Sequence, residues 1–220
     1  CITEAQKLFE DLLTCNASSW NALIAGYAEN GATEKVLKCL EKMEEARISS
    51  CAITLISCLK VCSTVGDLDS GYKMHTEIVN KGFERDVALG NALIGMYAKC
   101  GSLPEAKEVF NSMPIQDIVV WNALIAGYVE HGPVHEALNC FECMQIGGTS
   151  PDSITFTCML KACGCIGALD KGKQIHDEII CNGLLQKDTV LGNCLVDMYA
   201  KCGALAKAQE VFNQLPIQNV

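Results

Sequence analysis

Apolar residues recur along the chain at the spacing of short α-helices. Between residues 102 and 113, one helical face collects Leu103, Ala106, Val109, Phe110 and Met113. Ser102 and Glu105 have the spacing of a capping box, and Pro104 is tolerated in the first turn. A preceding helix is expected from about Asn91 to Lys99, ended by a left-handed Gly101. This pattern predicts a helical hairpin.

The same pattern occurs more than once. The string WNALIAGYAENG at 20–31 returns as WNALIAGYVEHG at 121–132, a separation of 101 residues, and MYAKCG at 96–101 returns at 198–203. EVFNSMPIQD from residue 108 matches EVFNQLPIQN from residue 210. Neither helix of a hairpin can bury its apolar face alone, so hairpins stack side by side. We therefore predict an all-α fold, a right-handed α-solenoid of helix-turn-helix repeats.

Each copy of the block divides into three similar repeats, whose starts align on the tetrads WNAL, GNAL and GNCL. The predicted division is a partial repeat at 1–16, then 17–51, 52–86, 87–117, 118–152, 153–188 and 189–219. Repeats 87–117 and 189–219 are each 31 residues long, and the other complete repeats have 35 or 36 residues. Phe110 and Phe212 are expected in the core stripes of the second helices.

Composition restricts the classes of function. No apolar run approaches the roughly 20 residues that span a bilayer, so no membrane partner is expected. The net charge of −9 disfavours non-specific nucleic-acid binding, which normally needs a basic face. Several of the 15 cysteines recur with the repeat, as in Cys39 with Cys140, Cys62 with Cys163 and Cys100 with Cys202. We expect them to be free thiols at packing positions rather than a disulfide framework.

Motif and repeat length together point to one family. The string from Trp121 to Tyr128, followed by Gly132, Ala137, Phe141, Met144 and Pro151-Asp152, resembles the pentatricopeptide repeat. The order of long and short repeats is similar to the P, L and S triplets of plant members, with P at 17–51 and 118–152, L at 52–86 and 153–188, and S at 87–117 and 189–219. The resemblance implies single-stranded RNA as partner, one base per repeat.

In that family the fifth and last residues of a repeat choose the base, and second residues clamp it. The resemblance implies the base-reading residues Asn21, Asn91 with Asp117, Asn122 with Asp152, Thr157 with Asp188, and Asn193 with Asn219. Repeat 17–51 ends in Cys51, a poor hydrogen-bond partner, and repeat 52–86 has Ile56 at its fifth position. The implied bases are therefore a weak pyrimidine, an unspecified base, U, U, a guanine-leaning position, and C or U.

The remaining contacts follow from position in the repeat. The implied clamps are Ala88, Val119, Ile154 and Val190, with Ser18 as a polar exception, and we expect phosphate contacts from Lys99 and Lys201. Family members of this type act in mitochondria or chloroplasts as targeting modules of C-to-U RNA editing or RNA processing. The resemblance implies the same location here, and RNA-editing accessory proteins bound through the L repeats.

Alternatives remain open at this stage. Asparagine at the fifth position could be structural, because asparagine is also a favoured helix cap. A tetratricopeptide-like scaffold that binds protein partners would suit an acidic chain, although tetratricopeptide repeats have a constant length of 34 residues. His176-Asp-Glu178 and Cys140-Phe-Glu-Cys143 contain pieces of a zinc deaminase signature in reversed order. His75-Thr-Glu77 stands at the same place in repeat 52–86 as His176-Asp-Glu178 in repeat 153–188, so the histidine belongs to the repeat pattern. We therefore expect no metal, no cofactor and no catalytic residue.

Overall fold

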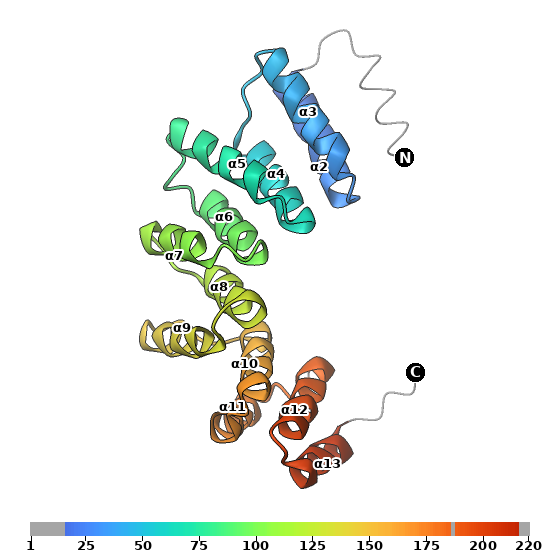
Figure 1. Cartoon of the computed structure of the whole chain (residues 1–220), viewed down its shortest axis with the longest axis vertical. Coiled ribbons are helices and arrows are strands. Elements are labelled where there is room, and N and C mark those ends of the chain that lie inside the picture. Colours follow the sequence, from blue (N-terminus) through green and yellow to red (C-terminus); the bar gives the residue numbers. More distant parts are fainter. Residues whose placement is uncertain (1–15, 186–187, 216–220) are drawn as a thin grey trace. The chain divides into compact units, whose positions relative to one another are not determined.

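The computed structural model describes residues 16–185 and 188–215, and within them it contains twelve helices and no strand. The all-α prediction is therefore confirmed. The chain divides into two compact units, Cys1–Ile115 and Gln116–Val220, called the first and second unit here. Each unit is a helical solenoid of stacked hairpins, and Figure 1 shows the hairpins in chain order.

The first unit contains three hairpins, each made of a first and a second helix. They are α2 (Ala17–Glu29) with α3 (Thr33–Glu45), α4 (Ala52–Val65) with α5 (Leu68–Asn80), and α6 (Val87–Lys99) with α7 (Leu103–Ser112). The first helices form a continuous layer, because α4 contacts both α2 and α6. The second helices α3 and α5 each also contact the first helix of the next hairpin. Every apolar stripe in the stack is thus covered by a neighbour.

The second unit repeats this architecture. Its hairpins are α8 (Ile118–His131) with α9 (Val134–Ile146), α10 (Ser153–Ile166) with α11 (Leu169–Cys181), and α12 (Thr189–Lys201) with α13 (Leu205–Gln214). Again the middle first helix, α10, contacts both α8 and α12. The first helices of this unit therefore also share one layer, and they carry candidate binding residues such as Asn122 and Asn193.

Each first helix begins directly after a capping residue. The caps are Asn16, Cys51, Asp86, Asp117, Asp152 and Asp188. The carboxylates of Asp86, Asp117 and Asp152 accept from the backbone N–H three residues later, which satisfies an amide left free at the helix start. These helices start at the first residues of the repeats proposed above. The division into repeats itself stays a prediction.

Two local expectations were wrong. Helix α6 starts at Val87 rather than Asn91, because the Asp86 carboxylate accepts from Leu89 N (3.0 Å) and nucleates the helix four residues earlier. The capping box at α7 does not form, since the Ser102 hydroxyl donates to Glu105 Oε2 (2.7 Å) instead of capping a backbone amide. The expected left-handed Gly101 is confirmed by its φ of 76°.

The core follows the predicted stripes, with one exception. All five apolar residues expected on one face of α7, from Leu103 to Met113, are buried. Phe212, expected in the matching stripe of α13, is instead 61% exposed. The physical reason is that, among the helices described in the second unit, α12 is the neighbour that packs on α13, so the far face of α13 faces solvent.

Repeated histidine and cysteine positions serve packing between helices. His75 Nδ1 pairs with the Tyr97 hydroxyl at 2.8 Å, and His176 Nδ1 pairs with the Tyr199 hydroxyl at 2.9 Å. Every cysteine within the described ranges is a free thiol. Burial raises the pKa of Cys62, and that of its repeat partner Cys163, to about 11 in each case. These thiols are therefore protonated and inert at neutral pH.

A matched pair of isoleucines tests this description of the second unit. Ile125 on α8 is completely buried, whereas Ile154 on α10 is 60% exposed. We expect Ile125→Ala to lower the free energy of unfolding by about 2–4 kcal/mol, because it leaves a cavity. Ile154→Ala should change it by less than about 0.5 kcal/mol. Urea denaturation of the two variants measures the difference, and equal losses would contradict the assignment of Ile154 to the surface.

Candidate nucleic-acid interface

The second and fifth residues of each proposed repeat lie on the same face of a first helix. Residues three apart are neighbours on a helix surface, as Val119 and Asn122 are on α8. The expected clamps Val119, Ile154 and Val190 are between 56% and 60% exposed, and Ala88 is also exposed. These exposed side chains occupy the second position of successive proposed repeats. They give each layer of first helices an apolar surface on which a planar ring can stack.

The pair Asn122 and Asp152 is joined directly. Asn122 Nδ2 donates to Asp152 Oδ1 at 3.0 Å, across the contact between α8 and α10. The Thr155 hydroxyl donates to Asn122 Oδ1 at 2.6 Å, so both ends of the amide are held. Asn122 itself is buried, with 8% of its surface exposed. The carboxylate also accepts from Thr155 N (2.8 Å) and thus caps α10 with the same oxygen atom.

These contacts hold the Asp152 side chain in its charged form. Burial acts to raise the pKa of the Asp152 carboxyl, but the hydrogen bonds from Thr155 and Asn122 outweigh it, and the pKa lies below its ordinary value. A charged acceptor forms stronger hydrogen bonds than a neutral one. The carboxylate is therefore a firm anchor for the Asn122 amide.

The first unit has the same network with a thiol in place of the carboxylate. Asn21 Nδ2 donates to Cys51 Sγ at 3.0 Å, and the Thr54 hydroxyl donates to Asn21 Oδ1. Burial acts to raise the pKa of Cys51, but hydrogen bonds from Thr54 and Asn21 lower it below its ordinary value. A sulfur atom accepts hydrogen bonds weakly, so the anchor of Asn21 is weaker than that of Asn122.

The other expected base-reading residues are placed as follows. Asn91 is half-buried on α6 of the first unit, and Asp117 caps α8 of the second unit through Val120 N at 3.0 Å. Thr157 is half-buried on α10 and hydrogen-bonds the Cys194 thiol of α12, while Asp188 caps α12 through Val190 N at 2.9 Å. Asn193 is exposed on α12. Asn219 lies outside the described residues.

The two expected phosphate contacts differ in their surroundings. Lys99 is exposed at the end of α6. Lys201 forms an ion pair with Asp197 at 2.7 Å, both side chains being about half exposed. The carboxylate of Asp197 accepts from the Lys201 ammonium and attracts it, which raises the pKa of Lys201. A phosphate at Lys201 would therefore compete with an existing carboxylate.

Three further residues on first helices, two in the first unit and one in the second, were not among the residues expected from the sequence. Ile53 is the second residue of repeat 52–86 and is 62% exposed, so it matches the other clamps. Lys60 and Lys161 are exposed at the ninth position of repeats 52–86 and 153–188, four residues after the fifth. Four residues are about one helical turn, which places each lysine beside the base-reading position. Their common place in the repeat was the signal that could have identified them.

Comparison with known proteins assigns the chain to a family. A family model described as the PPR repeat family matches residues 116–165, and one described as the PPR repeat matches residues 18–48, 91–118, 154–184 and 193–219. The chain belongs to the pentatricopeptide repeat family. It is 38% identical to the Arabidopsis thaliana pentatricopeptide repeat-containing protein At3g09040, mitochondrial, over 96% of the chain and 20% of that protein.

Other pentatricopeptide repeat proteins match along the whole chain. At1g15510, chloroplastic, of Arabidopsis thaliana is 32% identical over 100% of the chain and 25% of its own length. The chain thus spans a quarter or less of these two relatives. Among solved structures, the pentatricopeptide repeat protein PPR10 from maize matches with a TM-score of 0.59 at 19% identity. The match covers 98% of this chain and 37% of the PPR10 chain.

Two further structures share the fold. PPR10 in complex with an 18-nt psaJ RNA element matches with a TM-score of 0.54 at 20% identity, over 97% of this chain and 37% of that one. Nuclear proteinaceous RNase P 2 of Arabidopsis thaliana matches with a TM-score of 0.60 at 13% identity, over 75% of this chain and 38% of that one. At these identities the likeness is one of fold, the helical solenoid of pentatricopeptide repeats.

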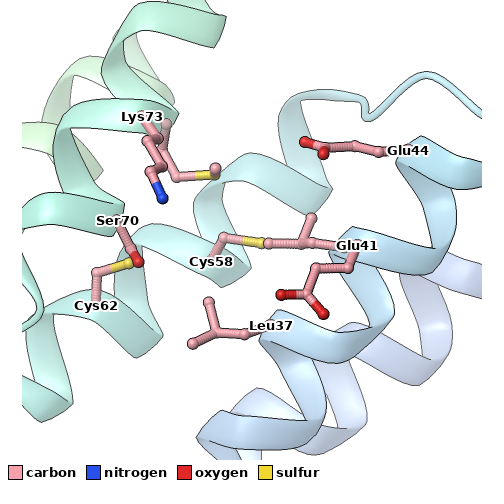
Figure 2. Close-up of a pocket in the computed structure, with 9 residues that line it drawn as sticks. Leu37, Glu41, Glu44, Cys58, Cys62, Ser70 and Lys73 are labelled. Atoms are coloured by element: carbon pink, nitrogen blue, oxygen red, sulfur yellow. The ribbon is translucent and has the colours of Figure 1, made fainter.

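Helices α3, α4 and α5 of this pentatricopeptide repeat array line a separate hollow. A cavity of about 170 Å³ in the first unit is bordered by Glu41 and Glu44 of α3, by Cys58 of α4 and by Lys73 of α5 (Figure 2). Burial raises the pKa of Cys58 far above its ordinary value, so its thiol is no activated nucleophile.

No group of three potential metal ligands occurs among residues 16–185 and 188–215. None of the helices there is long and apolar enough to cross a membrane.

The pKa of Asp152 leads to a stability prediction. Because the folded-state pKa is lower than the unfolded value of about 3.9, the contacts of the carboxylate stabilise the fold above that pH. This stabilisation is lost as the pH falls through the folded pKa. Asp152→Ala should therefore cost about 1 kcal/mol at pH 7, as expected for a lost helix cap, and less below about pH 4.

Urea denaturation from pH 3 to pH 7 measures this effect. Asp170→Ala is the control, because Asp170 is an exposed residue in the first turn of α11 that makes a surface ion pair with Lys173. A surface pair of this kind contributes little to stability. A cost for Asp152→Ala that does not change with pH would contradict the role of its charge.

Proposed function

We propose that the chain binds single-stranded RNA along its layers of first helices, with one base at each repeat. The hydrogen bond between Asn122 and Asp152 carries this proposal. It joins the fifth and last residues of one repeat, which lie 30 positions apart in the chain, and the exposed side chains of Val119 and Ile154 occupy the second positions of that repeat and the next. This arrangement supports the reading of one base by two or three side chains of a repeat.

The amide of Asn122 retains the groups needed to select a pyrimidine. An amide has two N–H donors and two acceptor lone pairs, and one of each is used by Asp152 and Thr155. One donor and one acceptor remain on the same side chain. The Watson–Crick edge of uracil offers a carbonyl acceptor next to an N–H donor, which complements that pair.

The comparisons support RNA as the ligand. The protein PPR10, whose fold this chain shares, has been solved in complex with an RNA element. The proposed order of bases along the repeats from 17–51 to 189–219 is a weak pyrimidine, an unspecified base, U, U, a guanine-leaning position, and C or U. Asn21, Asn91, Asn122, Thr157 and Asn193 supply the fifth positions that make this choice.

Charge sets the strength of binding. With a net charge of −9, affinity must come from local contacts of amides, apolar clamps and a few lysines rather than from a basic surface. Lys60, Lys99 and Lys161 are exposed on the first helices and are the proposed phosphate contacts, and Lys201 joins them if RNA displaces Asp197. The salt dependence of binding should be correspondingly modest.

We also propose a cellular role. Relatives of this chain are named mitochondrial or chloroplastic, which supports an organellar location. The order of P, L and S repeats supports a targeting module for C-to-U RNA editing or RNA processing, with accessory proteins bound through L repeats. In this proposal the array selects the RNA, and catalysis belongs to other components.

Changing the fifth residue tests base selection. Asn122→Thr should shift the preference at the fourth nucleotide of the register from U towards G, because the shorter side chain exchanges an amide for a hydroxyl at the base edge. A gel-shift panel of single-stranded RNAs that differ at that nucleotide measures the shift. Asn139→Thr makes the same change on the exposed surface of second helix α9 and should have no effect.

The outcomes separate RNA binding from a protein scaffold. Unchanged selectivity in Asn122→Thr defeats one-base-per-repeat recognition by this residue pair. Absence of binding to any RNA of the panel, together with binding of peptide ligands, supports a scaffold instead.

The phosphate contact is tested through the salt dependence of binding. Lys161→Ala should weaken binding to all RNAs of the panel about equally. It should reduce the slope of log affinity against log salt by about 0.7, the value for one contact to a single strand. Lys173→Ala on second helix α11 is the control and should leave the slope unchanged. An unchanged slope in Lys161→Ala removes this residue from the interface.

A further inference from the structure

Two first helices carry a threonine as their third residue, and both threonines contact the preceding repeat. Thr54 on α4 and Thr155 on α10 are completely buried. The hydroxyl of each threonine donates a hydrogen bond to the side-chain amide oxygen of an asparagine on the preceding first helix. Thr54 donates to Asn21, and Thr155 donates to Asn122. The matching residues of α6, α8 and α12 are Leu89, Val120 and Leu191, which have no hydroxyl.

The geometry at Thr155 restricts the rotation of the asparagine amide. The terminal torsion of asparagine is broad, so a single hydrogen bond to Asp152 would let the amide plane swing. The hydroxyl of Thr155 lies 2.6 Å from Asn122 Oδ1 and 2.9 Å from Asp152 Oδ1. The hydroxyl has a single proton that can be directed to either oxygen, and the contact with the asparagine is the shorter of the two. With its nitrogen held by Asp152 and its oxygen by Thr155, the amide is fixed at two points.

The first unit shows that the threonine contact does not require an aspartate. There the last residue of the repeat is Cys51, a weak partner for Asn21 Nδ2, yet Thr54 still donates to Asn21 Oδ1. Thr54 also accepts from Cys51 N at 3.3 Å, and Thr155 accepts from Asp152 N at 3.2 Å. The threonine is therefore attached to its own helix start in both units and presents its proton to the amide.

We propose that Thr155 is a positioning residue for base selection by Asn122, and that Thr54 has the same role for Asn21. This inference rests on the proposed function. The threonine holds the amide plane so that the remaining N–H and the remaining lone pair face one pyrimidine edge. The choice of base at one repeat then depends on the third residue of the following repeat, in addition to the fifth and last residues.

Thr155→Val tests the proposal because it keeps the branched shape and removes the proton. At the fourth nucleotide of the register, preference for U over the other bases should fall by about three- to tenfold, the effect of one lost hydrogen bond. Preference at the other nucleotides should stay unchanged. Competition binding with single-stranded RNAs that vary one nucleotide at a time measures both quantities. Thr155→Ser, which restores the hydroxyl, should restore the selectivity.

Controls separate positioning from a loss of structure. Thr189→Val makes the same chemical change at the exposed first residue of α12 and should leave selectivity unchanged. Thermal unfolding monitors the fold of each variant. If Thr155→Val does not fold, Thr155→Ser and Thr155→Ala are compared instead, and selectivity should be kept by the serine and lost by the alanine.

Each result has one interpretation. A folded Thr155→Val with the selectivity of the unmodified chain overturns the positioning role, as do serine and alanine variants of equal selectivity. An unmodified chain that binds RNA without selecting this base overturns base reading by Asn122 and, with it, the present inference. A selective chain with an unaffected Thr155→Val overturns the inference alone, so the two failures are distinguishable.

Discussion

The cap at the start of each first helix is the constraint on which the rest of the arrangement depends. A residue at this place must satisfy a free backbone amide of its own helix, which stabilises the helix by about 1 kcal/mol. In the second unit Asp152 does this and holds Asn122 of the preceding first helix with the same oxygen atom. The cap therefore links local helix formation to the packing of successive hairpins, and one side chain serves both.

Stacking then decides which surface is available for a ligand. Apolar stripes on both helices of a hairpin are buried against neighbouring helices, so each first helix is left with one free face. Within each unit these faces are adjacent, because α4 contacts α2 and α6, and α10 contacts α8 and α12. The second, fifth and ninth residues of the proposed repeats occur on that face by helical spacing alone. A repetitive surface is thus a direct result of a repetitive core.

The sequence was sufficient for features that depend on periodicity. It predicted the helical hairpins, the apolar stripe of α7 and the family, since each follows from spacing along one helix or between repeats. It failed where a contact depends on geometry across helices. The threonine at 155 looks like an ordinary polar residue of α10, and its contact with Asn122 becomes visible once α8 and α10 are packed. Within one helical turn the Ser102 hydroxyl could either accept from a backbone N–H or donate to the Glu105 carboxylate, and residue spacing alone cannot decide between the two.

The capping role also changes how the last residue of a repeat is interpreted. Asp86 ends repeat 52–86 and caps α6, yet the fifth residue of that repeat is Ile56, which can neither donate nor accept a hydrogen bond. An aspartate at this place is therefore explained by helix capping alone, and its presence is no evidence for base recognition. The informative feature is a polar fifth residue in contact with the cap, as in Asn122 with Asp152. In the proposed function the fifth residue therefore selects the base, and the cap and the following threonine determine how firmly its side chain is held.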